Sequence, residues 1–252
     1  TGGVSYPGTG STGDGINFAE ETGHRMKDLR PALIGLQTKQ PFPRQLKGLT
    51  LKNISMTFYH GRKTLKTEVG DLLFTHLGIS GPLVISMSGM VVDWLRNQED
   101  VFVELDLKPG LSSQNLERRL LNDFKTFPRK TIKNFLKDFL PQRMIAIFLN
   151  LARIDPVKQV NKISQEERLR MLELFKKLRI DILSSEPLGA AMVTQGGVSV
   201  RDIDPKTMQS RVIQGLFFAG EIMDVDGDTG GFNLQAAFST GYLAGQASAQ
   251  RI

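Results

Sequence analysis

The stretch GLFFAGEIMDVDGDTGGFNLQAAFSTGYLAG, residues 215–245, determines how the rest of the chain is interpreted. Its short apolar run at 216–219 lies between two glycines, as is typical of a buried strand. Glu221 follows directly, and open α/β sheets bind ligands at the carboxyl ends of their strands. An acidic, glycine-rich loop comes next, and helical spacing begins near Asn233. This order predicts a ligand site, although a plain strand–turn–helix corner with a solvated loop explains the periodicity equally well.

The start of the predicted helix suits an electron-rich group. A helix N-terminus offers unpaired N–H groups and a partial positive charge. Gly230 and Gly231 precede it and carry no side chain that would keep a flat ring away from those groups. The residues expected on the inner side of the helix are Leu234, Ala237, Phe238, Gly241, Tyr242 and Gly245.

Four stretches resemble one family of bacterial flavoproteins. They are the 215–245 stretch, TGGVSYPGTGSTGDG at 1–15, LLFTHLGISGP at 72–82 and VTQGGVSV at 193–200. The family is that of the NAD(P)/FAD-dependent oxidoreductases described as aminoacetone-oxidase-like or bile-acid-reductase-like. The resemblance implies an FAD enzyme that transfers hydride between NAD(P)H and a small organic substrate. In such enzymes the protein supplies binding, orientation and electrostatics.

The resemblance also implies which residues contact the FAD. Glu221 would accept hydrogen bonds from the ribityl hydroxyls, and the N–H groups of 231–234 would stabilise the negative charge that a reduced flavin gains. Gly197 would lie where the backbone passes close to the ring. The implied cofactor-binding residues are Gly2, Gly3, Gly197, Gly220, Glu221, Gly230, Gly231, Phe232, Asn233 and Leu234. No residue is singled out as catalytic.

The histidines have less specific roles. In the family, the FTHxGxSGP pattern lies in an inserted domain that closes over the flavin, so His76 and Ser80 are candidates for contact with substrate. The preferred alternative is structural: with Thr75 they hydrogen-bond the turn and cap the helix that follows. His24 is expected to end a short helix rather than to act as a base. Three histidines without metal-ligand spacing predict no metal site.

The middle of the chain changes pattern twice. Short alternating stretches between about 31 and 111 predict a small β-barrel or sandwich. Within it, the alternation of 49–58 slips by one residue at Lys52 and Asn53, which indicates a bulge. From 112 to 184 apolar residues recur at helical spacing and predict a helical bundle.

These patterns predict an α/β fold with an α+β insertion. Residues 1–30 and 201–252 are assigned to a remnant of a Rossmann-like FAD domain, and 31–200 to the inserted domain. The β part of that insert is placed at about 31–111 and 185–200. A GxGxxG strand–turn–helix unit, which normally holds the FAD pyrophosphate, is not found. We therefore expect this chain to be part of a longer flavoprotein and, by itself, inactive, colourless and prone to self-association.

Composition excludes several kinds of protein. The 252 residues include no cysteine, which excludes disulfides, Fe–S clusters and thiol redox chemistry. No apolar run approaches the roughly 20 residues that span a bilayer. No grouping of Ser, His and Asp indicates a hydrolase. We expect a cytoplasmic protein that acts on a small molecule and not at a membrane.

The net charge of +6 is concentrated in one segment, because 112–184 contains 16 Lys and Arg against 8 Asp and Glu. Such a segment can bind nucleic acid or another anionic partner. This suggests a second function, that of a non-enzymatic binding module. A solvated helical face is the preferred interpretation, and nucleic acid is not the expected partner. The phenylalanines of this segment fall mostly on apolar phases, where they should be buried rather than free to stack on bases.

Overall fold

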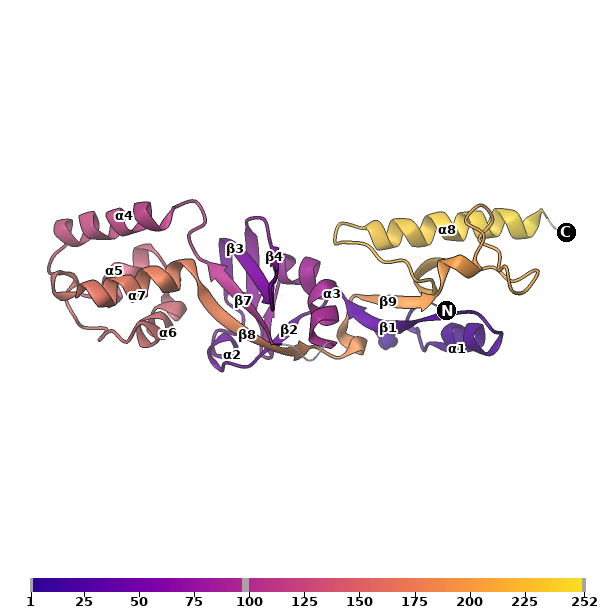
Figure 1. Ribbon diagram of the computed structural model, residues 1–252, viewed down its shortest axis with the longest axis horizontal. Coiled ribbons are helices and arrows are strands. Elements are labelled where there is room, and N and C mark those ends of the chain that lie inside the picture. The colour runs from indigo at the N-terminus through magenta and orange to yellow at the C-terminus, as the bar shows by residue number, and fades with distance from the viewer. Residues whose placement is uncertain (1, 97–99, 251–252) are drawn as a thin grey trace. The chain divides into compact units, whose positions relative to one another are not determined.

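The computed structural model describes residues 2–96 and 100–250 (Figure 1). The chain divides into two compact units, which are treated separately below. The first comprises Thr1–Leu36, Val84–Arg96 and Ser184–Ile252, and the second comprises Gln37–Leu83 and Asn97–Leu183.

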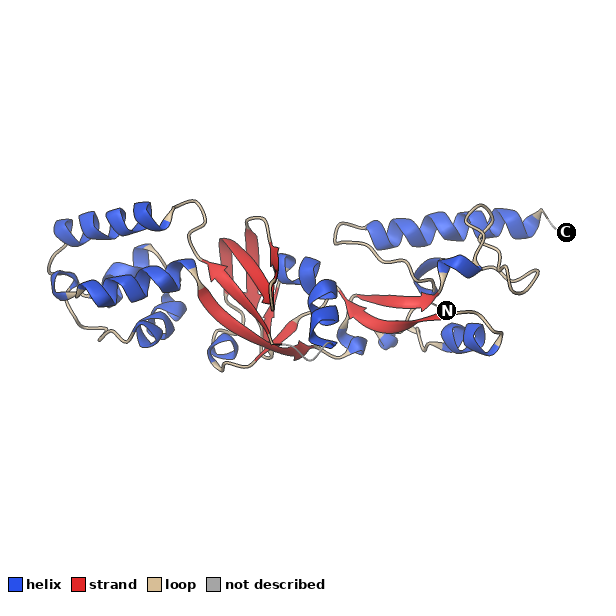
Figure 2. Ribbon diagram, in the orientation of Figure 1, coloured by secondary structure: helices blue, strands red, loops and turns tan. Residues whose placement is uncertain are grey.

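The second unit contains a closed β-barrel, seen as the larger group of red strands in Figure 2. Its strands are β2 (Leu36–Thr38), β3 (Thr50–His60), β4 (Lys63–Lys66), β5 (Gly70–Phe74), β6 (Gly78–Ser80), β7 (Val101–Asp106) and β8 (Leu178–Ser185). Their order is β4-β3-β5-β6-β2-β8-β7, and a further pairing of β3 with β7 closes the ring. The expected barrel is therefore present.

The long strand β3 contains the expected bulge. Its register against β5 shifts between Leu51 and Ile54, and Asn53 adopts a left-handed conformation with φ of 54°. The extra residue lets Leu51 and Ile54 both face the interior, where each is buried. The bulge predicted from the break in alternation at Lys52 and Asn53 is therefore confirmed.

The helical part lies between β7 and β8. Its helices are α4 (Ser113–Thr126), α5 (Ile132–Phe135), α6 (Gln142–Ala152) and α7 (Gln165–Lys176), and the short α2 (Phe42–Gln45) precedes β3. Phenylalanines fill its core: the ring of Phe135 lies 5.0 Å from that of Phe124, and Phe148 lies 4.6 Å from Phe175. Ser164 and Glu167 form the expected capping box at the start of α7.

Two expectations for this segment are corrected. Leu178 to Ser184 is not helical but belongs to strand β8, where Leu178, Ile180 and Ile182 are buried in alternation. The spacing of Leu178 and Ile182 by four residues fits either a helix or every second position of a strand, so it did not distinguish them. Phe127, expected inside, is 50% exposed.

The first unit is built around a two-stranded sheet. Its elements are α1 (Asp14–Glu21), β1 (Met26–Ala32), α3 (Pro82–Arg96), β9 (Val193–Val198) and α8 (Phe232–Ala249). Strand β1 pairs antiparallel with β9, and residues of α3 pack beside this pair: Val92 contacts Ile34 and Ala191. The residues 31–36, 84–96 and 184–200 therefore belong to this unit, although their patterns assigned them to the insert.

The stretch 215–245 has only part of the structure that was predicted for it. Residues 216–219 do not form a strand; Phe217 makes a single antiparallel bridge to Gln209, while Phe218 is buried against Ile16 and Ala19 of α1. The helix does begin as expected, at Phe232. Most of its supposed inner face is exposed, however, with Phe238 70% accessible, although Ala237 is half-buried beside Gly220. The Rossmann-like layer stays a prediction.

Candidate flavin site

Three segments that are far apart in sequence meet at Glu221: the N-terminal segment, strand β9 and the 3₁₀ turn η6 (Gly220–Ile222), which contains Glu221 itself. One carboxylate oxygen, Oε1, accepts hydrogen bonds from the hydroxyl of Ser5 and from the backbone N–H of Thr194, both at 2.8 Å. The hydroxyl of Thr194 in turn accepts the N–H groups of Val4 at 2.9 Å and Ser5 at 3.0 Å. Glu221 and Thr194 therefore anchor the N-terminal segment on β9.

Gly3 occupies a position that tolerates no side chain. A Cβ atom there would lie 2.4 Å from both Glu221 Oε1 and Thr194 Oγ1. Gly2 has a φ of 69° and lies beside Ser11. These contacts explain why the segment TGG lacks side chains after its first residue, independently of any ligand.

A second arrangement fixes the start of α8. The side-chain amide of Asn233 accepts a hydrogen bond from Gly227 N at 2.9 Å and donates one to Gly227 O at 2.8 Å. Gly230 and Gly231 have φ of 117° and 89°, which few other residues adopt. Gly231 is the N-cap and supplies no side-chain cap, so the N–H groups of the first turn keep no side-chain acceptor.

These features border a pocket of about 170 Å³. Gly220, Glu221, Asn233 and Leu234 line it together with small and apolar residues. Typical cofactor pockets measure roughly 300–1,000 Å³, so this one fits part of a flavin rather than the whole. Among the described residues, Glu221 Oε2 receives no hydrogen bond, which leaves it available to a ligand hydroxyl.

The acidic loop borders a neighbouring pocket of the first unit, of about 270 Å³, lined by Ser86, Gln195 and Asp226 among others. Burial by the surrounding protein raises the pKa of Asp226, and the carboxylates of Asp224 and Asp228 act in the same direction, while Gln195 and the guanidinium of Arg30 act against it. Asp226 is nevertheless exposed at the rim, so solvent limits the size of this shift.

The structure thus brings together some of the predicted residues. Gly220, Glu221, Asn233 and Leu234 line the pocket. Gly3 does not line it but lies next to the carboxylate of Glu221. Gly230, Gly231 and Phe232 form the approach to α8, where Phe232 is exposed and rests on Gly230. Gly2 lies apart, beside Ser11.

Gly197 packs against another backbone segment, and its predicted place beside a flavin ring stays a prediction. A Cβ atom on Gly197 would meet the carbonyl oxygen of Ile222 at 2.4 Å, and its φ is 111°. The close approach is therefore one of backbone to backbone, between β9 and η6, and Gly197 does not line the pocket.

His76 and Ser80 belong to the second unit, in the β5–β6 hairpin. His76 is exposed in the turn, and Ser80 pairs with Leu73 in the sheet. The turn is closed by Thr75, whose hydroxyl accepts the N–H of Gly78 at 3.0 Å. Thr75 therefore has the structural role that was preferred on the basis of the sequence, that of hydrogen-bonding the turn.

Thr194, Ser5 and Asp226 were not selected from the sequence, although each lies in a stretch that was quoted. Each is a residue with a hydroxyl or carboxyl group inside a glycine-rich motif, which could have marked it as a candidate. The sequence does not show, however, that the hydroxyl of Thr194 binds the N-terminal segment. No cluster of three His, Asp or Glu suited to a metal occurs in residues 2–96 and 100–250. No helix in that part of the chain is long and apolar enough to cross a membrane.

Comparison with known proteins adds a family match. Residues 30–193 match the model described as "HI0933-like protein barrel and H2TH domain", which covers the barrel and the helical part.

Individual relatives match over nearly the whole chain. It is 30% identical over 251 residues to the 3-dehydro-bile acid delta(4,6)-reductase of Clostridium scindens, covering 99% of the chain and 61% of that protein. It is 32% identical over 248 residues to the ribosomal RNA dihydrouridine synthase of Escherichia coli, covering 98% and 58%, respectively. The enzyme of that name from Haemophilus influenzae is 31% identical, with 96% and 57% covered. The chain thus spans about three fifths of the length of these relatives.

Proposed function

This chain belongs to the family of the HI0933-like protein barrel and H2TH domain, and we propose from this premise that it forms part of a flavin-dependent reductase acting on carbon–carbon double bonds. The names of the relatives support the reaction. One denotes a reductase of the Δ4,6 double bonds of a 3-dehydro bile acid, and the others denote a synthase of dihydrouridine, a nucleoside whose base has a saturated ring bond. In both substrates the double bond is conjugated to a carbonyl group.

The residues present fit one portion of an FAD molecule. When bound, the flavin supplies the hydride chemistry, while the protein binds and orients it. Glu221 is suited to hold a hydroxyl-bearing chain, because Oε1 is fixed by Ser5 and Thr194 while Oε2 receives no hydrogen bond from the described part of the chain. The fixed oxygen holds the carboxylate in one orientation before any ligand arrives.

The start of α8 provides the electrostatic part of the site. The N–H groups of Phe232 to Leu234 lie in a helical first turn without a side-chain cap, and the helix dipole adds a partial positive charge. Asn233 holds this turn against Gly227, so the donors stay in place without reorganisation. Such preorganised donors stabilise negative charge that develops during a reaction.

Addition of hydride to a conjugated double bond must be followed by a proton. We assign the proton donor to a carboxyl oxygen of Asp226, one residue before Gly227 of the Asn233 clamp. Because its pKa is raised, this carboxyl keeps its proton at a higher pH than an ordinary aspartate does. NAD(P)H as the hydride source, FAD as the form of flavin and a cytoplasmic setting complete the proposal.

The observation that carries the proposal is the Ser5–Thr194–Glu221 assembly beside the uncapped α8. Its test is flavin titration of the protein that carries this chain, before and after Glu221→Ala. Loss of a partly buried hydrogen-bonding partner should weaken flavin binding by about 1–3 kcal/mol. Equal flavin affinity in both proteins would remove Glu221 from the site.

A kinetic test separates the proton donor from the binding residues. With NAD(P)H present, Asp226→Asn should leave flavin reduction unchanged but slow the reduction of an unsaturated 3-dehydro bile acid or of ribosomal RNA, by roughly 10²–10⁴-fold. The matched control is Asp228→Asn, a neighbour in the same loop with the same change of charge. Equal slowing by both substitutions would exclude a specific role for Asp226.

A further inference from the structure

Two adjacent backbone segments in the helical part form a surface that the proposed reaction does not use. Residues 125–133 run from the end of α4 to the start of α5, and residues 156–162 lead through η3 (Val160–Lys162) toward α7. They lie antiparallel: Ile132 N donates to Lys158 O at 2.8 Å, and Val160 N donates to Lys130 O at 3.0 Å. The two segments therefore lie side by side at one end of the helical part, where the chain passes from α4 to α5 (Figure 1).

The charge of this surface is unusually one-sided. The two segments contain six basic residues and no Asp or Glu: Lys125, Arg129, Lys130, Lys133, Lys158 and Lys162. Lys130 pairs with Asp138 at 2.9 Å and Lys158 with Glu167 at 2.8 Å. Within the described residues the other four make no ion pair, and all four are exposed. Asp155 and Glu166 flank the surface without entering these pairs.

An exposed aromatic ring lies among these cations. Phe127, at the C-cap of α4, is 50% exposed, and the ammonium group of Lys130 lies 5.4 Å from the centre of its ring. Asn161, also exposed, donates its backbone N–H to the carbonyl of Pro128 beside it. An open ring with several free cations and an exposed amide is the combination that stacks on a base while neutralising phosphates.

We propose that this surface, defined by Lys125, Phe127, Arg129, Lys133 and Lys162, binds single-stranded RNA. The expectation of a merely solvated face assumed that the phenylalanines are buried, and Phe127 is not. An anionic membrane is the weaker partner, because the exposed apolar groups here are Phe127 and Val157 on turns rather than one face of a helix. Two relatives are named for a modification of ribosomal RNA, which makes an RNA partner chemically consistent.

The first test measures affinity against salt, with binding followed by fluorescence anisotropy. The probe is a labelled single-stranded RNA of about 12 nucleotides, within the usual site size. With four to six phosphates neutralised, the slope of log K against log salt should be about −3 to −4. Lys125→Gln/Arg129→Gln/Lys162→Gln should reduce the slope by about 2. Lys47→Gln/Lys63→Gln/Lys66→Gln, which removes the same charge from exposed barrel sites, should reduce it much less.

The second test separates stacking from charge. Phe127→Leu keeps an apolar side chain but removes the ring, and should lower affinity roughly 5- to 150-fold with the salt slope unchanged. Phe127→Tyr should retain most of the affinity. Because Phe127 is half exposed, both variants should unfold at the same urea concentration as the parent, which circular dichroism checks.

Three results would overturn the proposal. One is equal loss of affinity in the two triple variants, which would show non-specific attraction. Another is equal affinity of Phe127→Leu and Phe127→Tyr. The third is binding to vesicles of phosphatidylserine and phosphatidylcholine without binding to RNA. The inference goes beyond the proposed reduction, and because binding is measured without turnover or flavin, failure of one does not decide the other.

Discussion

His24 and Ser210 are joined by a buried hydrogen bond of 2.7 Å between Nε2 of the ring and the serine hydroxyl. The neighbours fix its direction. Nδ1 lies 3.0 Å from the carbonyl oxygen of Ala19, which only accepts, so Nδ1 carries a hydrogen. Ser210 Oγ already accepts the N–H groups of Val212 and Ile213 and therefore donates to His24. His24 is thus a structural residue that ties the end of α1 to the 199–213 loop, as its position after α1 indicated.

This arrangement predicts an unusual sensitivity to a small substitution. Ser210→Ala would remove the partner of the buried His24 Nε2 and of the part-buried N–H groups of Val212 and Ile213, and should reduce the free energy of unfolding by about 1–3 kcal/mol. Ser239→Ala, on the exposed side of α8, should leave it nearly unchanged. Urea unfolding of both variants checks this. Equal stability of the two would mean that the His24–Ser210 bond contributes little.

The glycine at 197 predicts a larger loss. Gly197→Ala would place Cβ 2.4 Å from the carbonyl oxygen of Ile222, at a φ of 111° that alanine rarely adopts. The substitution should cost at least about 2 kcal/mol through strain and overpacking. Gly241→Ala, where a Cβ meets no atom, should instead stabilise α8 by about 0.5–1 kcal/mol. Thermal unfolding of the pair gives the comparison, and a neutral effect of Gly197→Ala would contradict the close approach of β9 and η6.

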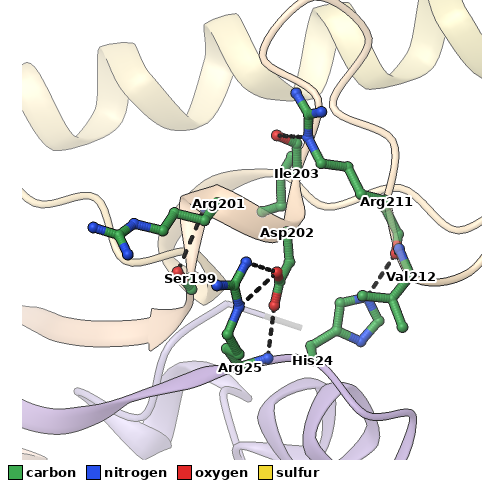
Figure 3. A network of polar contacts seen from close by, with 9 residues as sticks. His24, Arg25, Ser199, Arg201, Asp202, Ile203, Arg211 and Val212 are labelled. Atoms are coloured by element: carbon green, nitrogen blue, oxygen red, sulfur yellow. Dashed lines mark hydrogen bonds and ion pairs between the residues drawn. The ribbon is translucent and has the colours of Figure 1, made fainter.

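A third prediction concerns pH. The guanidinium of Arg25 hydrogen-bonds the buried carboxylate of Asp202 and holds the pKa of Asp202 below its usual value (Figure 3). Because the folded-state pKa is lowered, the stabilisation is fully present above the unfolded pKa of about 3.9 and is lost as pH falls through the lower folded value. Asp202→Asn should therefore lower the unfolding temperature by several degrees at pH 7 but much less at pH 3.

The control for this prediction is Asp100→Asn. Asp100 pairs with Lys39, but its side chain is 85% exposed, so the pair should contribute little at either pH. A gap between parent and Asp202→Asn that stays constant from pH 7 to pH 3 would show that the carboxylate charge is not what stabilises this contact.

Local pattern was sufficient for features that depend on neighbours in sequence. The bulge at Asn53, the capping box of Ser164 and the start of α8 all follow from residues a few positions apart. Such features repeat wherever the local chemistry does, and they were predicted correctly.

Features that depend on distant partners were not predictable in this way. Strand β8 begins at Leu178 because β7 lies beside it, and among the described residues 216–219 form one bridge, from Phe217 to Gln209. Phe127 repeats the apolar spacing of α4 but lies at its C-cap, where half of the residue stays exposed. In the site, Glu221 and the glycines were visible as a motif, whereas Thr194 acts through chain segments nearly 200 residues away in sequence.

The role of Thr194 leads to the last prediction. Its hydroxyl is the acceptor for the N–H groups of both Val4 and Ser5, so it holds the N-terminal segment on the site. Thr194→Val keeps the shape of the side chain but removes that acceptor. The free energy of local opening at each of these two N–H groups should then fall by about 1–2 kcal/mol. Hydrogen exchange at Val4 and Ser5 should accelerate roughly 5- to 30-fold, because exchange follows the free energy of local opening. Thr194→Ser retains the hydroxyl and should exchange like the parent. If Thr194→Val also leaves exchange at Val4 and Ser5 unchanged, the segment is held by Glu221 alone, and the flavin site does not depend on Thr194.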